Sequence, residues 1–145
     1  MISVQEFRNK IDETGDEFPL LTLEEFFDGN EDEYSIAPNE ADDGRPEIAE
    51  IYEKFKSLES NDSIAWIRVF LHDDTVITET DDNEELLLCG DSIVICTCLS
   101  REEMEELADC EWLMSGGVSE LDLSEYINCY PDIPSCYRCL TVEWD

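Results

Sequence analysis

Two apolar runs constrain the fold of this chain most, because acidic side chains interrupt nearly every other segment. Residues 64–71 (IAWIRVFL) are rich in β-branched and aromatic side chains, which predicts a strand. Residues 92–99 (SIVICTCL) are apolar at odd and even positions alike, which predicts a central strand covered on both faces. A sheet is therefore expected to carry the core.

Helices are expected on both sides of these strands in the sequence. Ser3 and Thr22 can cap short helices near the N-terminus. Pro46 is expected at the first position of the most regular helix, where its missing N–H costs nothing. Ser100 with Glu103 forms a capping-box pattern after the second apolar run.

The remaining segments are expected to add shorter strands. Residues 75–79 are predicted to pair with the first apolar run across a turn at residues 72–74, and residues 86–88 to pair with the second across Gly90-Asp91. Other predictions are strands at residues 34–37 and 140–144, a loop at 38–45 and a helix at 118–127. This order predicts one α+β domain over residues 1–145. We expect a mostly antiparallel sheet of four to five strands, with N-terminal and interspersed helices packed on it.

Charge limits the partners that such a protein can have. The chain carries 39 Asp and Glu against 8 Lys and Arg, which gives a formal net charge of -31 at pH 7. A surface of this kind repels nucleic acids and anionic membranes, and it attracts basic proteins over long range. We therefore expect a basic protein partner, no direct nucleic-acid binding and no membrane association.

The cysteines are expected to be reduced thiols in the cytoplasm. The N-terminus, MISVQEFRNK, lacks the apolar region of a signal peptide, and no apolar stretch approaches transmembrane length. Thiols stay reduced in the cytoplasm, and the odd count of 7 cysteines argues against a complete set of intramolecular disulfides.

No catalytic motif stands out. His72 is the single histidine and precedes Asp73 and Asp74, but a polar turn between two strands explains this triplet better than catalysis does. The chain contains no G-x-S-x-G, P-loop or G-x-G-x-x-G pattern. We therefore expect that the protein is not an enzyme and uses no cofactor.

Metal binding is not expected either. Cys136 and Cys139 have the spacing of a zinc knuckle, but structural zinc needs four ligands. The second pair would have to be Cys129 with either Cys110 or His72, at irregular spacing. The sequence therefore predicts no metal site.

Residues 21–39 (LTLEEFFDGNEDEYSIAPN) resemble the opening of small bacterial immunity proteins that accompany polymorphic and contact-dependent toxins. The resemblance continues through the helix after Pro46, the aromatic strand, the SIVICT strand and the terminal VEWD. It implies a protein that binds its cognate toxin and blocks it without catalysis. Many such toxins are nucleases with basic clefts, which a strongly acidic inhibitor would suit.

Partner-binding residues are expected in two acidic regions that contain no Lys or Arg. The first comprises Asp28, Glu31, Asp32 and Glu33, with Asp42 and Asp43 behind them. The second comprises Asp73, Asp74, Asp81, Asp82 and Glu84. The alternative hypothesis is a nucleic-acid mimic that inhibits a DNA-binding or restriction enzyme, which would need carboxylates in rows that match the spacing of duplex phosphates.

Overall fold

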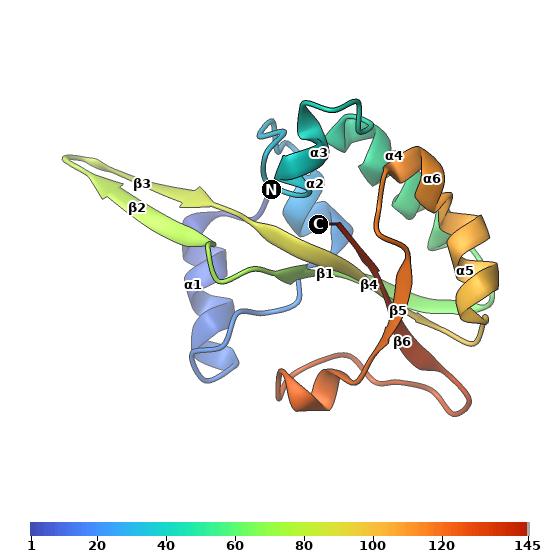
Figure 1. The fold of residues 1–145 in the computed structure, drawn as a ribbon. Helices are drawn as coiled ribbons and strands as arrows, with labels where there is room; N and C mark the ends of the chain where they lie inside the picture. Colours follow the sequence, from blue (N-terminus) through green and yellow to red (C-terminus); the bar gives the residue numbers. More distant parts are fainter. Residues whose placement is uncertain (145) are drawn as a thin grey trace.

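The computed structural model describes residues 1–144, in which helices and strands are mixed along the chain (Figure 1). The helices are α1 (Val4–Glu13), α2 (Leu23–Phe27), α3 (Pro38–Ala41), α4 (Ile48–Leu58), α5 (Arg101–Ala108), α6 (Cys110–Leu113) and the 3-10 helix η1 (Leu123–Glu125). The strands are β1 (Ile64–Leu71), β2 (Val76–Thr80), β3 (Asn83–Leu87), β4 (Gly90–Thr97), β5 (Val118–Leu121) and β6 (Arg138–Glu143). The predicted α+β class is confirmed. None of the helices in this described part has the length and apolar character that a bilayer crossing needs.

The main sheet has four antiparallel strands in the order β1-β4-β6-β5. β4 lies inside this sheet, and its side chains alternate between two buried clusters. Ile93 and Ile95 belong to the larger cluster, whereas Val94 and Cys96 belong to the smaller one. The prediction of a central strand with two covered faces is therefore confirmed.

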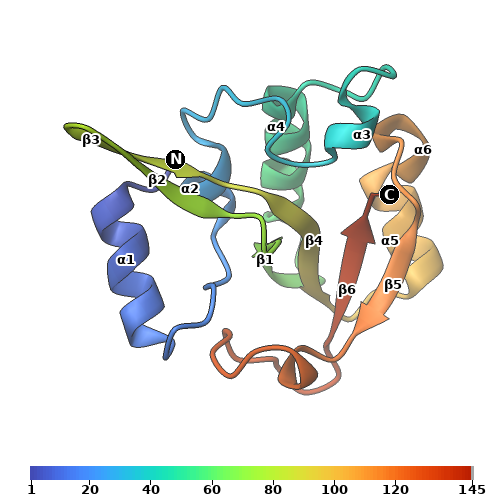
Figure 2. The same ribbon diagram turned by 60° about the vertical axis from the view of Figure 1, so that its left-hand side comes forward.

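The two faces of the sheet are covered by different segments. The larger cluster contains residues from α1, α2, α4, α5 and α6, with Phe7, Phe26 and Phe55 among its fully buried side chains. The smaller cluster is closed by Leu123 and Ile127, which lie in the segment between β5 and β6. Figure 2 shows this segment on the far side of the sheet from α4.

The chain makes one long hairpin whose outer half leaves the body. β2 and β3 pair with each other and project as a two-stranded arm (Figure 1), while β1 and β4 pair inside the body. Between the halves lies a short waist, where His72 N–H donates to the carbonyl of Cys89 at 2.7 Å, and the hydroxyl of Thr75 donates to the same carbonyl at 3.1 Å. The chain reverses at Asp81 and Asp82, since Thr80 pairs with Asn83.

This hairpin corrects two predicted pairings. The segment over 75–79 pairs with β3 and not with β1, and the segment over 86–88 does not fold back on β4. The predicted polar turn after β1 does form, because the N–H of Thr75 donates to the carbonyl of His72 at 3.0 Å, but it does not bring β2 back onto β1. The hydrogen bonds between Thr75 and Cys89 instead continue the pairing of the hairpin through the waist. Gly90 belongs to β4, and its backbone N–H donates to the carbonyl of Ser35 at 2.6 Å.

The predicted helix over residues 118–127 is wrong. Residues Val118–Leu121 form β5 instead, because the free edge of β6 offers them a complete hydrogen-bonding partner. A short turn of 3-10 helix follows, and the side chain of Asp122 caps it by accepting from the N–H of Ser124.

Three boundaries near the N-terminus also differ. Residues 34–37 form only an isolated bridge between Ile36 and Gly90, because Ala37 has a φ of 48° that ends the extended backbone. The predicted loop at 38–45 contains the short helix α3, which begins with Pro38. Pro46 lies before the N-cap Glu47, so α4 starts later than predicted.

The predicted helix caps do form. Ser3 and Thr22 accept hydrogen bonds from the backbone N–H groups of Glu6 and Glu25. The Ser100 half of the predicted capping box forms at the start of α5, at 3.1 Å from the N–H of Glu103.

Candidate functional site

The acidic loop after α2 is held in one conformation by its own side chains. The amide of Asn30 donates to the carbonyl of Phe26 at 3.0 Å, and its oxygen accepts from the N–H of Asp32 at 2.9 Å. The carboxylate of Asp32 in turn accepts from the N–H of Tyr34 at 3.0 Å. These successive Asx turns fix the backbone, so a short polar sequence presents rigid carboxylates.

Glu33 has a structural role within this loop. The guanidinium of Arg45 is only 1% exposed, and it donates to the carbonyl and the carboxylate of Glu33 at 2.6 and 3.3 Å. The same carboxylate accepts from the N–H of Ile48 at 3.0 Å, at the start of α4. Glu33 therefore compensates a buried charge, and its carboxylate is already engaged before any partner binds.

The two faces of the arm hold carboxylates that differ in whether a cation of the chain pairs with them. Glu79 and Glu84 lie directly opposite each other, and the guanidinium of Arg8 on α1 pairs with both. Hydrogen bonding to Glu84 is the main cause that raises the pKa of Arg8. Side chains alternate along a strand, so the neighbouring Glu85 lies on the opposite face, away from Arg8. Asp81 and Asp82 are exposed at the tip.

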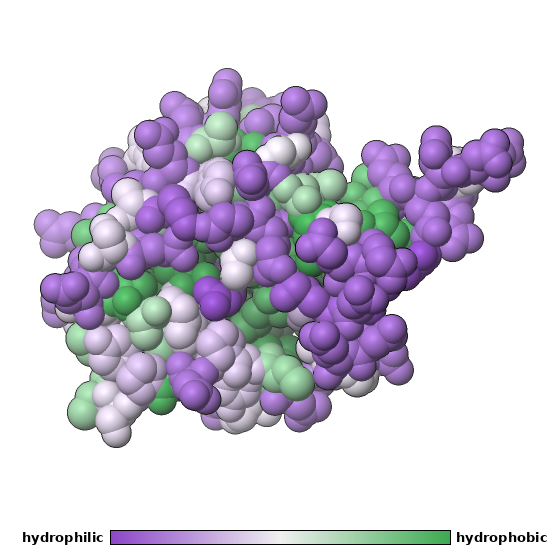
Figure 3. Space-filling model, turned by 180° about the vertical axis from the view of Figure 1, so that it is seen from behind, coloured by the Kyte–Doolittle hydropathy of each residue, from purple (hydrophilic) through white to green (hydrophobic). Residues whose placement is uncertain are grey.

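The structure brings part of the two predicted acidic regions together. Glu31 and Asp32 from the loop and Glu85 from β3 line one groove of about 300 Å³, which we call the acidic groove. The rest of its lining is uncharged apart from the N-terminus and consists of Met1, Gly29, Asn30, Ser35, Leu86, Leu87 and Leu88. Figure 3, seen from behind, shows the outer part of the arm as a hydrophilic projection, with a hydrophobic patch where the projection joins the body.

The other predicted residues lie elsewhere. Asp73 lines a separate pocket with Asp16 and Glu17. Asp42 accepts from the hydroxyl of Tyr34 at 2.8 Å, and this bond is the main cause that raises the pKa of Tyr34. Asp28 and Asp43 are exposed outside the groove lining.

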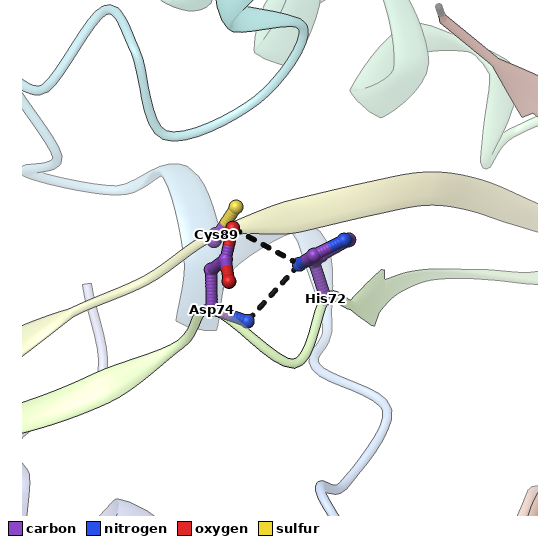
Figure 4. Close-up of side chains that lie close together, drawn as sticks. All are labelled: His72, Asp74 and Cys89. Carbon is purple, nitrogen blue, oxygen red and sulfur yellow. Dashed lines mark hydrogen bonds and ion pairs between the residues drawn. The ribbon is translucent and has the colours of Figure 1, made fainter.

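A cluster of three different side chains lies at the waist of the hairpin (Figure 4). One ligand atom from each of His72, Asp74 and Cys89 can be chosen so that all lie within 4.8 Å of one another. The N–H of Asp74 donates to Nδ1 of His72 at 3.0 Å, and the Asp74 carboxylate lies 3.5 Å from the same nitrogen. Backbone groups of Cys89 are fixed by Thr75, whose hydroxyl accepts from the Cys89 N–H at 3.0 Å.

This cluster opens onto a pocket of about 250 Å³ whose lining includes Asp91 and Trp144. Asp91 is the extra residue of a β-bulge, because Leu71 pairs with Gly90 and Phe70 with Ser92. Burial is the main cause that raises the pKa of the Cys89 thiol, and the carboxylates of Asp74, Asp91 and Asp32 raise it further. Asp32 also lines the acidic groove, so its carboxylate contributes to the negative electrostatic potential at both sites.

A protein-family model matches residues 2–142, which is nearly the whole chain. The chain belongs to the uncharacterized protein YfbO family. No curated protein and no solved structure matches it. Membership in the YfbO family assigns neither a ligand nor a partner to the acidic groove or to the waist cluster, so both must be interpreted from their chemistry.

Sequence reasoning missed three residues of these sites. The sequence does not predict that Cys89 lies beside His72, because the expected pairing of residues 75–79 with the first strand leaves Cys89 no place next to His72. Glu85 and Asp91 were not selected either, although strand alternation separates Glu85 from Glu84 and could have placed it on the other face. No sequence signal marks the bulge that exposes Asp91.

The remaining cysteines occupy different environments. Cys96 and Cys139 are buried and lie opposite each other on β4 and β6. Burial, followed by the neighbouring Cys96, raises the pKa of the Cys139 thiol to about 12. Cys129 and Cys136, which the knuckle hypothesis would combine with Cys139, are exposed.

Proposed function

We propose that the protein is a non-catalytic inhibitor whose acidic groove binds a basic partner protein in the cytoplasm. The observation that supports this proposal is the convergence of the loop and the arm, which places Glu31, Asp32 and Glu85 around one groove. We further propose that the partner is a cognate toxin with a basic, nuclease-like cleft, as the resemblance of residues 21–39 implies. That segment supplies the loop side of the groove.

The groove carboxylates have no basic partner inside the described chain. Within residues 1–144, the Glu side chains that form ion pairs with Lys or Arg are Glu24, Glu25, Glu33, Glu59, Glu79 and Glu84. Glu31, Asp32 and Glu85 are absent from this set, and they are exposed. Lys and Arg side chains of a partner would relieve their mutual repulsion.

A rigid acidic groove suits a basic protein surface more than it suits a substrate. The Asx turns and the contacts of Arg45 with Glu33 fix the loop before binding, so little conformational entropy is lost on association. Long-range attraction would raise the association rate constant to about 10⁸ M⁻¹s⁻¹ at low salt. An inhibitor of a harmful protein must bind it quickly, and electrostatic attraction provides that speed at the expense of sensitivity to salt.

The experiment compares two charge reversals of equal size. One variant carries Glu31→Lys, Asp32→Lys and Glu85→Lys in the groove. The matched control carries Glu102→Lys, Glu106→Lys and Glu120→Lys, which are exposed and form no ion pair with Lys or Arg among residues 1–144. The genes beside this one are first searched for a toxin, and a neighbourhood without one counts against the toxin assignment. Association with the purified toxin domain found there is then measured over a salt series, together with inhibition of the toxin.

We expect the groove variant to associate at least about tenfold more slowly at low salt and to lose inhibition, whereas the control keeps most of both. The wild-type rate should fall steeply as salt rises, because screening shortens the range of the attraction to about 10 Å at 0.1 M. Equal effects of both variants, or a rate independent of salt, would show that the acidity serves solubility instead. Absence of binding to the neighbouring toxin would remove the toxin assignment.

A further inference from the structure

The waist of the long hairpin brings together an imidazole, a carboxylate and a thiol, which are three kinds of metal-binding side chain. Within residues 1–144, His72, Asp74 and Cys89 are the one group of three or more His, Cys, Asp or Glu residues whose ligand atoms approach one another this closely. They come from two segments, since His72 and Asp74 follow β1 and Cys89 follows β3. Figure 4 shows them around the point where these segments meet.

We propose that His72, Asp74 and Cys89 bind one zinc ion, with a fourth coordination position open to the adjacent pocket. This proposal is independent of the proposed inhibitor function. It also departs from the expectation of no metal, which considered His72 only in combination with the distant Cys129 and the Cys136–Cys139 pair.

The electrostatic surroundings favour a cation at this point. Asp74 and Asp91 line the pocket beside Cys89, and the described residues of its lining include no Lys or Arg. A divalent ion bound there would be stabilised by the two carboxylates, and it would in turn stabilise the Cys89 thiolate that binds it.

The donor types favour zinc and similar transition metals over Mg²⁺ and Ca²⁺. A thiolate and an imidazole are poor ligands for Mg²⁺ and Ca²⁺, which prefer oxygen, and good ligands for Zn²⁺. Zinc bonds to S, N and O at about 2.0–2.3 Å, so tetrahedral ligand atoms stand roughly 3.3–3.7 Å apart. His72 Nδ1 and the Asp74 carboxylate already lie 3.5 Å apart.

Closing the site requires only motion of exposed side chains. The side chains of His72 and Asp74 are 47% and 80% exposed, so they can rotate toward the half-buried Cys89, whose backbone Thr75 holds fixed. The main loss is the hydrogen bond from the N–H of Asp74 to Nδ1 of His72, because that lone pair would bind the metal. Once the imidazole has rotated, water can accept from the N–H of Asp74 in its place, because Asp74 is exposed.

An open coordination position follows from the geometry of the pocket. Three protein ligands leave one tetrahedral position, and the pocket of about 250 Å³ in front of them has room for water. Asp91 lies on the same pocket lining, where its carboxylate can accept a hydrogen bond from that water. The site therefore has the donor number of an accessible zinc centre.

The test uses Co²⁺ as a spectroscopic probe on the reduced full-length protein, followed by displacement with Zn²⁺. We expect one ion per chain, a thiolate-to-cobalt charge-transfer band and tetrahedral d–d bands, all lost when zinc is added. Cys89→Ser should abolish the charge-transfer band, and His72→Gln should weaken Co²⁺ binding at least about tenfold. Native mass spectrometry gives the stoichiometry with Zn²⁺.

Matched controls separate this site from the other thiols and carboxylates. Cys110 is half-buried like Cys89, and Asp73 adjoins Asp74 but lines a different pocket, so Cys110→Ser and Asp73→Asn should leave binding unchanged. Circular dichroism of each metal-free variant checks its fold. A charge-transfer band that survives Cys89→Ser, or no stoichiometric binding by the wild-type protein, overturns the proposal. Loss of binding in Cys110→Ser would do the same.

Discussion

The inner and outer halves of one long hairpin have opposite chemistry. In the inner half, β4 is buried on both faces, and β1 contributes side chains to both apolar clusters. In the outer half, β2 and β3 form an arm in which Leu86 is the one residue classed as buried. The body is thus held by the hydrophobic effect, whereas the arm depends on its own pairing and on contacts with α1.

The pairing within the arm also differs between its two ends. Next to the body, Val76 lies opposite Leu87 and Ile77 lies opposite Leu86, so these pairs are apolar. Farther out, Glu79 lies opposite Glu84, an arrangement that is unfavourable for like charges and that the guanidinium of Arg8 compensates. The outer part of the arm thus carries the carboxylates, and Glu85 lines the acidic groove, which agrees with a role in recognition.

The comparison is tested most strongly by truncating one apolar side chain in each half. Ile95→Ala removes a fully buried side chain from β4 and should lower the free energy of unfolding by about 2–5 kcal/mol. Val76→Ala removes a side chain that is 47% exposed on β2 and should lower it by less than about 0.5 kcal/mol. Urea unfolding measures both, and equal losses would show that the arm folds as part of the core.

The waist between the halves can be tested by adding a single methyl group. A Cβ at Gly90 would meet side-chain carbons of Ile36 and Phe26 at 3.1 Å. Gly90→Ala should therefore destabilise the protein by about 1–3 kcal/mol through overpacking. Gly15→Ala is a poor control because Gly15 has a φ of 73°, so Ala65→Gly on exposed β1 surface is the better comparison. A neutral Gly90→Ala would contradict tight packing at the waist.

Much of the body could be predicted from the sequence. The apolar runs that became β1 and β4 carry their own pattern, and Ser3 and Thr22 mark helix starts through a local hydrogen bond. Predictions failed where a segment's structure depends on a distant partner. Val118–Leu121 is a strand because β6 lies beside it, which no local pattern records.

The candidate sites were harder to predict, for the same reason. The acidic loop was recognised by composition, but its groove exists only because β3 lies against it. Glu33 was grouped with its acidic neighbours, although a buried Arg45, distant in sequence, engages its carboxylate. The waist cluster depends on the pairing of His72 with Cys89, and the polar triplet at residues 72–74 suggested a reversal of the chain instead.

The smaller cluster of the body should make stability depend on alkaline pH. The pKa of Cys139 is raised from 9.0 to about 12 in the folded protein, mainly by burial. The unfolded state therefore loses this proton at a lower pH than the folded state does. The contribution of Cys139 to the free energy of unfolding is fully present below about pH 9 and is lost as the pH rises toward 12. The loss should be about 1.4 kcal/mol by pH 10, which corresponds to about one pKa unit.

Cys139→Ala and the exposed Cys136→Ala isolate this contribution. Urea unfolding of wild type and variants at pH 8 and pH 10 should show a flatter dependence for Cys139→Ala only. Cys139 should also react with iodoacetamide far more slowly than Cys136 at pH 8, because the thiolate is the nucleophile. Equal alkylation of both cysteines would indicate that the smaller cluster opens readily.

The smallest expected effect concerns the link between α1 and the arm. Arg8→Gln removes the cation that pairs with Glu79 and Glu84, and leaves their carboxylates facing each other uncompensated. Lys10→Gln is the matched control, since Lys10 lies on the same helix but pairs with Glu25 of α2 at 3.1 Å. Amide hydrogen exchange should become several-fold faster in β2 and β3 for Arg8→Gln, with little change in β1 and β4. Lys10→Gln should leave the arm unchanged. Arm amides that exchange at the wild-type rate in Arg8→Gln would show that Ile77 and Leu86, packed on the body, hold the arm without any contribution from the ion pairs.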